Sequence, residues 1–414
     1  MGERERFYAV VLGIQSPWQV SCVELVEETE EVRVLLKIST TTRRLPCPDC
    51  DAQCPGYDTR SRSWRHLDTC QFKTILQAEI PRVKCPTHGV RQIAVPWAEP
   101  GSGFTALMES LVIDWLKEAS IKAVSRLMGL TWDQIDGVMQ RAVRRGMARR
   151  KEITPTRIGI DETSFKKRHE YVTVVSDHET SDVLYVADNR KQDSLDGFFD
   201  QLEPADILRI EAVSMDMWEP YISAIKFYLH DAEKKICFDK FHVAQHLGNA
   251  VDKVRRLEHR KLMAEDDRTL VKSKYVWLKN PDNMGNKLAT SLARLKTLAL
   301  QTARAWAIKE HAMCLWHYIS RTWARKAWEG WISWAMRSRL EPIKKVARMV
   351  RAHLDGIINA IVLRATNAGA ESVNSKIQKV KRMACGFRNR DRFRTAIYFH
   401  LGGLDLRPAT HTRS

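Results

Sequence analysis

Short runs of apolar residues predict strands in the first 100 residues of the chain. Residues 7–14 (FYAVVLGI) and 31–38 (EVRVLLKI) are two such runs, and turn-prone or acidic residues separate them. Two further strand candidates, residues 63–67 and 74–83, lie between turns that carry cysteines. We therefore expect a small N-terminal β segment over residues 1–40, followed by a cysteine-bearing module over residues 41–100.

The pattern becomes helical after residue 101. Apolar residues then recur at steps of three and four, which predicts a helix that buries one face, formed by Phe104, Leu107, Leu111 and Trp115. This pattern continues to Gly129, after which Thr131 and Gln134 have the spacing of a capping box at the start of another helix. Two helices joined by a short glycine-containing turn predict a helix-turn-helix domain over residues 101–151.

Strand-like runs return from residue 156 and then alternate with helical segments up to residue 238. This order predicts a mixed α/β layer. Residues 241–364 have a helical pattern throughout, and seven of the thirteen tryptophans lie between Trp277 and Trp334. We interpret these tryptophans as the core of a helical domain, with a surface that stacks on nucleic-acid bases as the alternative.

Composition and charge narrow the class of protein. The 414 residues include 67 Lys and Arg against 50 Asp and Glu, a formal charge of +17 that favours a polyanionic partner. No apolar run approaches the roughly 20 residues that a membrane span requires, and residues 1–10 lack the pattern of a secretory leader. We expect a cytoplasmic protein that associates with the nucleoid through DNA and has no membrane partner.

Two pairs of residues have the spacing of zinc knuckles. Cys47 and Cys50 form one pair, Cys85 and His88 form the other, and strand-like sequence lies between them. Because four protein ligands would fill a tetrahedral site, we expect a structural Zn²⁺. Cys54 or Cys70 could replace His88 in this set.

Two basic segments are candidate DNA contacts. The first lies at the end of the helix-turn-helix, where we favour phosphate contacts over a solvated surface, and it comprises Arg141, Arg144, Arg145, Arg149 and Arg150. The second follows Glu371 near the end of the chain and includes Lys379, Lys381, Arg382 and Arg388.

Acidic residues at strand ends are candidate metal ligands. Asp161 ends the apolar strand 158–160, and Asp216 ends the strand 210–215, so the two carboxylates can meet at the edge of one sheet. Two-metal phosphoryl transfer requires such converging acidic groups. Asp239 and His242 could support this site, whereas Glu371 is either a metal ligand or a glutamate that stabilises a helix start.

Several motifs taken together resemble the DDE transposases of bacterial insertion sequences, in particular the ISL-three family. They are Cys47-Pro-x-Cys, Gly-Ile-Asp161-Glu-Thr-Ser-Phe, Val-Ser-Met-Asp216-Met-Trp, Phe-Asp239-Lys-Phe-His242-Val, Glu371-x-x-Asn374 and Gly386-Phe-Arg-Asn. The resemblance implies an RNase H-like core in which Asp161, Asp216 and Glu371 hold two Mg²⁺ (or Mn²⁺) ions. It also implies a helical insertion between Asp216 and Glu371, and a supporting role for Asn374. The family commonly has cysteine where this chain has His88.

The expected protein is therefore a multidomain α+β and α/β chain. Its predicted parts are a β segment (1–40), a zinc-finger module (41–100), a helix-turn-helix domain (101–151), the first part of an RNase H-like core (152–245), an all-helical insertion (246–364), the last part of the core (365–405) and a tail (406–414). We expect a transposase that binds the terminal inverted repeats of its element, cleaves DNA and transfers the freed strand to target DNA. We expect a homodimer or larger assembly on that DNA. A catalytically inactive DNA-binding regulator derived from a transposase is the alternative function.

Overall fold

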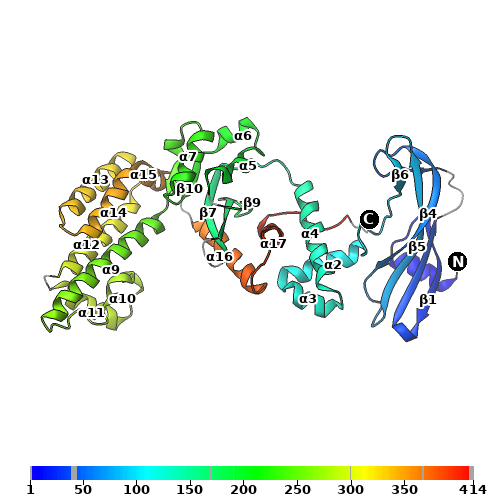
Figure 1. Cartoon of the computed structure of the whole chain (residues 1–414), viewed down its shortest axis with the longest axis horizontal. Coiled ribbons are helices and arrows are strands. Elements are labelled where there is room, and N and C mark those ends of the chain that lie inside the picture. The colour runs from blue at the N-terminus through cyan, green and yellow to red at the C-terminus, as the bar shows by residue number, and fades with distance from the viewer. Residues whose placement is uncertain are drawn as a thin grey trace. The chain divides into compact units, whose positions relative to one another are not determined.

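The computed structural model describes residues 2–38, 44–166, 170–189, 191–298, 300–365 and 368–409, and Figure 1 shows the chain. The chain forms two compact units. The first contains the described residues up to 150 together with those from Leu404 onward, and the second contains those from Lys151 to Gly403. Within the described ranges, no helix is both long and apolar enough to cross a membrane.

One six-stranded sheet dominates the first part of unit 1. Its strand order is β1-β2-β5-β4-β3 with β6 on β5, and only the β2–β5 pairing is parallel. The strands are β1 (Trp18–Val26), β2 (Glu31–Ile38), β3 (Arg44–Pro46), β4 (Gln53–Arg65), β5 (Lys73–Cys85) and β6 (Gly89–Gln92), with the 3₁₀ turn η1 (Glu27–Thr29) between β1 and β2. The predicted β segment and cysteine module are thus parts of one sheet with one apolar core. The predicted boundary at residues 40 and 41 lies outside the described residues.

The first apolar run forms a helix, α1 (Glu3–Val11), where we predicted a strand. Leu12 is buried and Tyr8 and Ala9 pack against the core of the sheet, whereas Phe7 and Val10 are exposed. That spacing of inward-facing residues is helical, and a strand would have placed Tyr8 and Ala9 on opposite faces. The prediction for residues 7–14 was therefore wrong.

Three helices follow in unit 1: α2 (Ala106–Glu118), α3 (Ile121–Met128) and α4 (Trp132–Ala148). The predicted capping box at Thr131 and Gln134 is present, and Gly129 has the positive φ of 61° that a tight helix end requires. The face of α2 differs from the prediction, because Leu107, Leu111 and Trp115 are exposed. The buried face contains Met108, Val112, Ile113 and Leu116.

Unit 2 contains a five-stranded sheet of order β11-β10-β7-β8-β9. Strands β7, β10 and β11 are mutually parallel, whereas β7-β8-β9 is an antiparallel meander. The strands are β7 (Arg157–Lys166), β8 (Glu170–Asp177), β9 (Val183–Ala187), β10 (Ala212–Met215) and β11 (Ile236–Phe238). The short segments η2 (Gln192–Leu195), α5 (Asp196–Phe199) and α6 (Pro204–Arg209) precede β10, and α7 (Glu219–Tyr228) and α8 (Ala232–Lys235) precede β11.

A group of helices lies between β11 and the last two helices of unit 2. The long helix α9 (Lys240–Ala264) leaves the sheet edge and leads into this group (Figure 1). The others are α10 (Lys274–Leu278), α11 (Asn286–Lys296), α12 (Gln301–Cys314), α13 (Arg321–Arg337), α14 (Glu341–Ala352) and α15 (Leu354–Leu363), with the 3₁₀ turns η3 (Pro281–Asn283) and η4 (Leu315–His317). Their apolar side chains form one continuous core with the sheet, in which Trp277, Trp328 and Trp331 are buried. Core packing therefore accounts for these three tryptophans, whereas the same prediction was wrong for Trp323 and Trp334, which are exposed.

Two final helices return to the sheet, α16 (Ala368–Met383) against β7 and α17 (Arg390–Leu401) against β9. The chain then leaves unit 2, and residues 404–409 pack on α4 of unit 1. Leu406 is buried there, so the segment predicted as a tail is ordered at its start. Residues 410–414 of that prediction lie outside the described residues.

Candidate functional site

Three aspartates lie at one level of the parallel strands. Asp216 and Asp239 directly follow β10 and β11, whereas Asp161 lies within β7, which continues to Lys166 and does not end at Asp161 as predicted. Ser214 on β10 pairs with Gly159 on β7, so two residues further along Asp216 lies beside Asp161. Met215 on β10 pairs with Phe238 on β11, so Asp216 also lies beside Asp239. The side chain of Asp216 is 48% exposed and therefore faces solvent at this edge.

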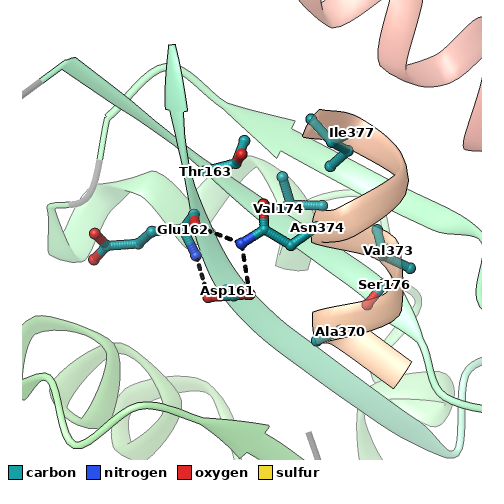
Figure 2. Close-up of a pocket in the computed structure, with 9 residues that line it drawn as sticks. All are labelled: Asp161, Glu162, Thr163, Val174, Ser176, Ala370, Val373, Asn374 and Ile377. Atoms are coloured by element: carbon teal, nitrogen blue, oxygen red, sulfur yellow. Dashed lines mark hydrogen bonds between the residues drawn. The ribbon is translucent and has the colours of Figure 1, made fainter. Parts of the chain in front are cut away.

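Helix α16 adds Glu371 to the same region. Asn374 Nδ2 lies 3.2 Å from both Asp161 Oδ2 and the carbonyl oxygen of Glu162, and it donates hydrogen bonds that fix the helix against β7 (Figure 2). A Cβ on Gly159 would lie only 3.1 Å from the Cβ of Ala370, so glycine permits this close approach. Glu371 follows Ala370 directly and lies close enough to Asp239 and His242 for their charges to affect its pKa.

Burial and neighbouring charge perturb these carboxyl groups. Burial raises the pKa of Asp161 to about 6, although the hydrogen bonds from the Glu162 amide and from Asn374 oppose this shift. Burial and the negative charge of Asp239 raise the pKa of Glu371. Carboxylates with this environment favour an added cation, because a cation would compensate for the lost hydration.

Asp239 and His242 hold the edge of the site together. The buried Asp239 caps α9, and its Oδ2 accepts a hydrogen bond from the Phe241 amide. His242 Nδ1 lies 3.5 Å from Asp216 Oδ1. Helix α9 therefore begins beside Asp216, in the region that we call the carboxylate cluster (Asp161, Asp216, Asp239 and Glu371), although the ligand atoms of these residues are not gathered as closely as those of the cysteine and histidine set.

Two contacts on α16 were not predicted from the sequence. Gln378 Nε2 donates to Thr163 Oγ1 at 2.7 Å, and Lys381 Nζ donates to the carbonyl oxygen of Ser164 at 2.6 Å. Lys381 is partly exposed and one of its donors is used within the protein, so the DNA contact predicted for it stays a prediction. Lys379, Arg382 and Arg388 remain exposed.

The four predicted zinc ligands lie together, with all ligand atoms within 4.8 Å of one another. His88 Nδ1 lies 3.6 Å from Cys85 Sγ and 3.8 Å from Cys47 Sγ, and Cys50 Sγ lies 3.7 Å from Cys85 Sγ. A tetrahedral zinc with Zn–S bonds of about 2.3 Å requires sulfur–sulfur distances of about 3.8 Å, so the set suits a structural Zn²⁺. Neither Cys54 nor Cys70 belongs to this cluster.

The basic end of α4 divides into buried and exposed residues. The side chain of Arg145 is only 7% exposed and forms ion pairs with Glu99 and the buried Glu109. Arg141 Nη2 also pairs with Glu109, at 2.6 Å. The prediction that Arg145 binds DNA is corrected, because its buried side chain neutralises a buried carboxylate inside unit 1. Arg141 neutralises the same carboxylate but is partly exposed, so its DNA contact stays a prediction.

Arg149 pairs with Asp405 and donates to the carbonyl oxygen of Arg407, so it holds the C-terminal segment. Arg144 is exposed and Arg150 is partly exposed. Arg149 is itself exposed, so the solvent-facing part of the predicted basic segment comprises Arg144, Arg149 and, in part, Arg150.

Comparison with known proteins gives matches along the chain. The ISL3 family model described as "Transposase" matches residues 158–397, which is more than half of the chain. The "Helix-turn-helix domain of transposase family ISL3" matches residues 93–143, and the "zinc-finger of transposase IS204/IS1001/IS1096/IS1165" matches residues 43–88.

Two similar proteins span nearly the whole chain. The transposase for insertion sequence element IS1557 of Mycobacterium tuberculosis is 29% identical, over 93% of this chain and 92% of its own length. The transposase for insertion sequence element IS1001 of Bordetella parapertussis is 26% identical, over 91% and 94%. With its zinc cluster, helix-turn-helix and mixed α/β unit in the matched order, the chain belongs to the ISL3 family of insertion-sequence transposases and is a DNA-binding transposase.

Proposed function

We propose that Asp161, Asp216 and Glu371 form the catalytic triad of an RNase H-like core. The observation that carries this proposal is the strand register that aligns Asp216 with Asp161, together with the Asn374 bond that holds α16 beside them. The mixed sheet, with three antiparallel strands followed by two parallel ones, has the order that this fold requires. Helices from α9 to α15 would then be an insertion between the second and third acids.

The residues of this site suit Mg²⁺ or Mn²⁺. The oxygens of Asp161, Asp216 and Glu371 are hard donors, and burial has raised the pKa of two of these groups. When bound, the two ions supply the charge that activates the attacking oxygen and stabilises the leaving one. The three carboxylates would hold the ions.

The chain's own residues then position the reacting groups. Asn374 orients the Asp161 carboxylate, and His242 lies beside Asp216 on the exposed side of the site. The DNA reactions are attack of water on a phosphodiester at the element end, followed by attack of the freed 3′-hydroxyl on target DNA. Both reactions would use the same carboxylates.

The remaining modules would select and hold the DNA. The zinc module and the helix-turn-helix would bind the terminal inverted repeats, with Arg144 and Arg150 near the phosphates. The exposed Lys379, Arg382 and Arg388 would contact the strand at the catalytic site. Two copies of the chain, one at each element end, would pair the ends in a homodimer or larger assembly.

The test is cleavage and strand transfer on DNA that carries the ends of the chain's own element, with Mg²⁺ present. We expect Asp161→Asn, Asp216→Asn and Glu371→Gln each to lower the cleavage rate by more than about 100-fold, because loss of a ligand exceeds the 10- to 100-fold effect of losing a group that orients one. The control is Asp200→Asn, an exposed aspartate outside the site that should cleave normally. Unchanged cleavage by any of the three variants would exclude this triad, and end binding without cleavage by the unmodified chain would favour an inactive regulator.

A further inference from the structure

Two aromatic residues occupy equivalent positions beside the carboxylate cluster. Trp218 comes two residues after Asp216, and Phe241 comes two residues after Asp239. Because Met215 pairs with Phe238 in the parallel β10–β11 ladder, these two chain segments leave the sheet side by side. Each aromatic residue then lies at a helix start, Trp218 as the N-cap of α7 and Phe241 in the first turn of α9.

Both aromatic side chains present apolar surface to solvent. Trp218 is 39% exposed and Phe241 is 52% exposed. The ring of Phe241 lies 5.7 Å from the ring of His242, whose Nδ1 is 3.5 Å from Asp216 Oδ1. The exposed apolar surface therefore adjoins the carboxylate that faces solvent. We define these two side chains as the aromatic rim of the site.

The function of the family limits what can cover the aromatic rim. A phosphodiester must approach the carboxylates for a transposase to act, so the neighbouring nucleotides must pass over adjoining side chains. Neutral aromatic rings contribute little to binding phosphates, but they stack well on the flat face of a base. That face is accessible only when the base leaves the duplex stack.

We propose that Trp218 and Phe241 form a stacking site for an unpaired base next to the phosphodiester that is cleaved. This proposal rests on the assignment of the catalytic site above. The stacking would offset the free-energy cost of unpairing the base and would hold the DNA backbone in an accessible position at the carboxylates. The ligand is a nucleobase in the DNA substrate, without a requirement for a particular sequence.

The buried tryptophans of the helical segment are unsuitable for this role. Trp277, Trp328 and Trp331 lie in the core, and exposing them would require the core to open. Trp323 and Trp334 of α13 are exposed, but only Trp218 and Phe241 directly follow the strands that lead to Asp216 and Asp239.

The experiment compares cleavage rates on two forms of element-end DNA with the full-length chain and Mg²⁺. One form is fully paired, and the other carries mismatches that leave the nucleotides beside the cleaved phosphodiester unpaired. We expect Trp218→Ala and Phe241→Ala to slow cleavage of paired DNA by about 5- to 150-fold, the range that corresponds to base–aromatic stacking. On mismatched DNA the defect should shrink to within about threefold, because unpairing no longer requires stacking.

Two further variants distinguish stacking from general apolar contact and from loss of folding. Phe241→Tyr should restore most of the rate, whereas Phe241→Leu should not, because leucine has no aromatic face. The matched control is Phe227→Ala, which removes a 77% exposed phenylalanine at the other end of α7 and should leave both rates unchanged.

The proposal is overturned if both alanine variants cleave paired DNA at the normal rate, if the defect is equal on paired and mismatched DNA, or if Phe241→Leu retains full activity. Asp216→Asn is measured alongside on both substrates. If Asp216→Asn cleaves normally, the catalytic site is misassigned; if it is inactive and the aromatic variants are normal, only the stacking site fails.

Discussion

His66 illustrates how a single side chain connects two parts of unit 1. It lies just after β4, and its Nδ1 is 2.8 Å from Oγ1 of Thr105, the N-cap of α2. Thr105 Oγ1 already accepts a hydrogen bond from the Met108 amide, so its hydroxyl hydrogen is available to donate to a neutral imidazole. Burial lowers the pKa of His66 to about 4 from the usual 6.5.

This environment predicts a loss of stability in mild acid. The folded state favours neutral His66. The stability that this side chain contributes is therefore complete above pH 6.5 and is lost as the pH falls from 6.5 toward 4. At pH 5 the expected loss is about 2 kcal/mol of unfolding free energy. His66→Gln stays neutral, so it should show a smaller loss between pH 7.5 and pH 5. The loss of stability is measured as the loss of hydrogen-exchange protection of β4 and α2 amides in the full chain. Equal losses in the unmodified chain and in His66→Gln would contradict this role of His66.

At the scale of elements, the register of α16 against β7 positions Glu371. Asn374, Gln378 and Lys381 are spaced four and three residues apart, so they share one helix face. Their bonds reach successive positions along β7, from Asp161 to Ser164. Together these bonds oppose sliding or rotation of the helix along the strand.

Loss of the middle bond should affect catalysis more than DNA affinity. We expect Gln378→Ala to lower the single-turnover cleavage rate at saturating DNA by about 10-fold and to raise the Mg²⁺ concentration that is required, because Glu371 would be held less firmly. Lys379→Ala, at the adjacent exposed position, should instead weaken salt-dependent DNA binding and leave the rate on bound DNA unchanged. Equal behaviour of the two variants would refute this role for Gln378.

Local sequence predicted those elements whose signals are local. The capping box at Thr131 and the start of the strand that carries Asp161 were predicted because a few adjacent residues specify them, but the predicted end of that strand at Asp161 was wrong, since β7 continues to Lys166. Helix α2 carries apolar side chains around most of its circumference, so periodicity alone did not select Met108 over Leu107 as the buried side. Arg145 was misassigned because its partners, Glu99 and Leu406, are distant in sequence.

At the scale of the whole molecule, the C-terminal segment completes unit 1. The carbonyl oxygen of Leu406 accepts hydrogen bonds from Arg145 Nε and Nη2 at 3.0 and 2.7 Å, and its side chain is buried. Arg407 Nη2 pairs with Asp114 of α2 at 3.0 Å. Residues far apart in the chain therefore stabilise the helix-turn-helix.

Removal of the buried side chain should weaken this unit. We expect Leu406→Ala to lower the unfolding free energy of unit 1 by roughly 2 kcal/mol and to weaken binding to element ends, because it leaves a cavity beside α4. Arg407→Ala removes only an exposed ion pair and should cost less than about 1 kcal/mol. Hydrogen exchange of amides in α2 and α4 measures the loss of stability caused by each substitution. An equal loss for Leu406→Ala and Arg407→Ala would exclude packing of the Leu406 side chain as the cause of that loss.

Because residues 404–409 belong to unit 1, unit 1 can be completed only after unit 2 has been synthesised. A ribosome makes the helix-turn-helix early, but it must translate all of unit 2 before Leu406 emerges, which takes tens of seconds at about 5–20 residues per second. Until then Arg145, which pairs with Glu109, lacks its hydrogen bonds to the carbonyl oxygen of Leu406. If unit 1 binds element ends as proposed above, the nascent chain would acquire its full capacity to bind them only after unit 2 has been made. A gene fragment that stops near residue 150 would encode a poor competitor for those ends.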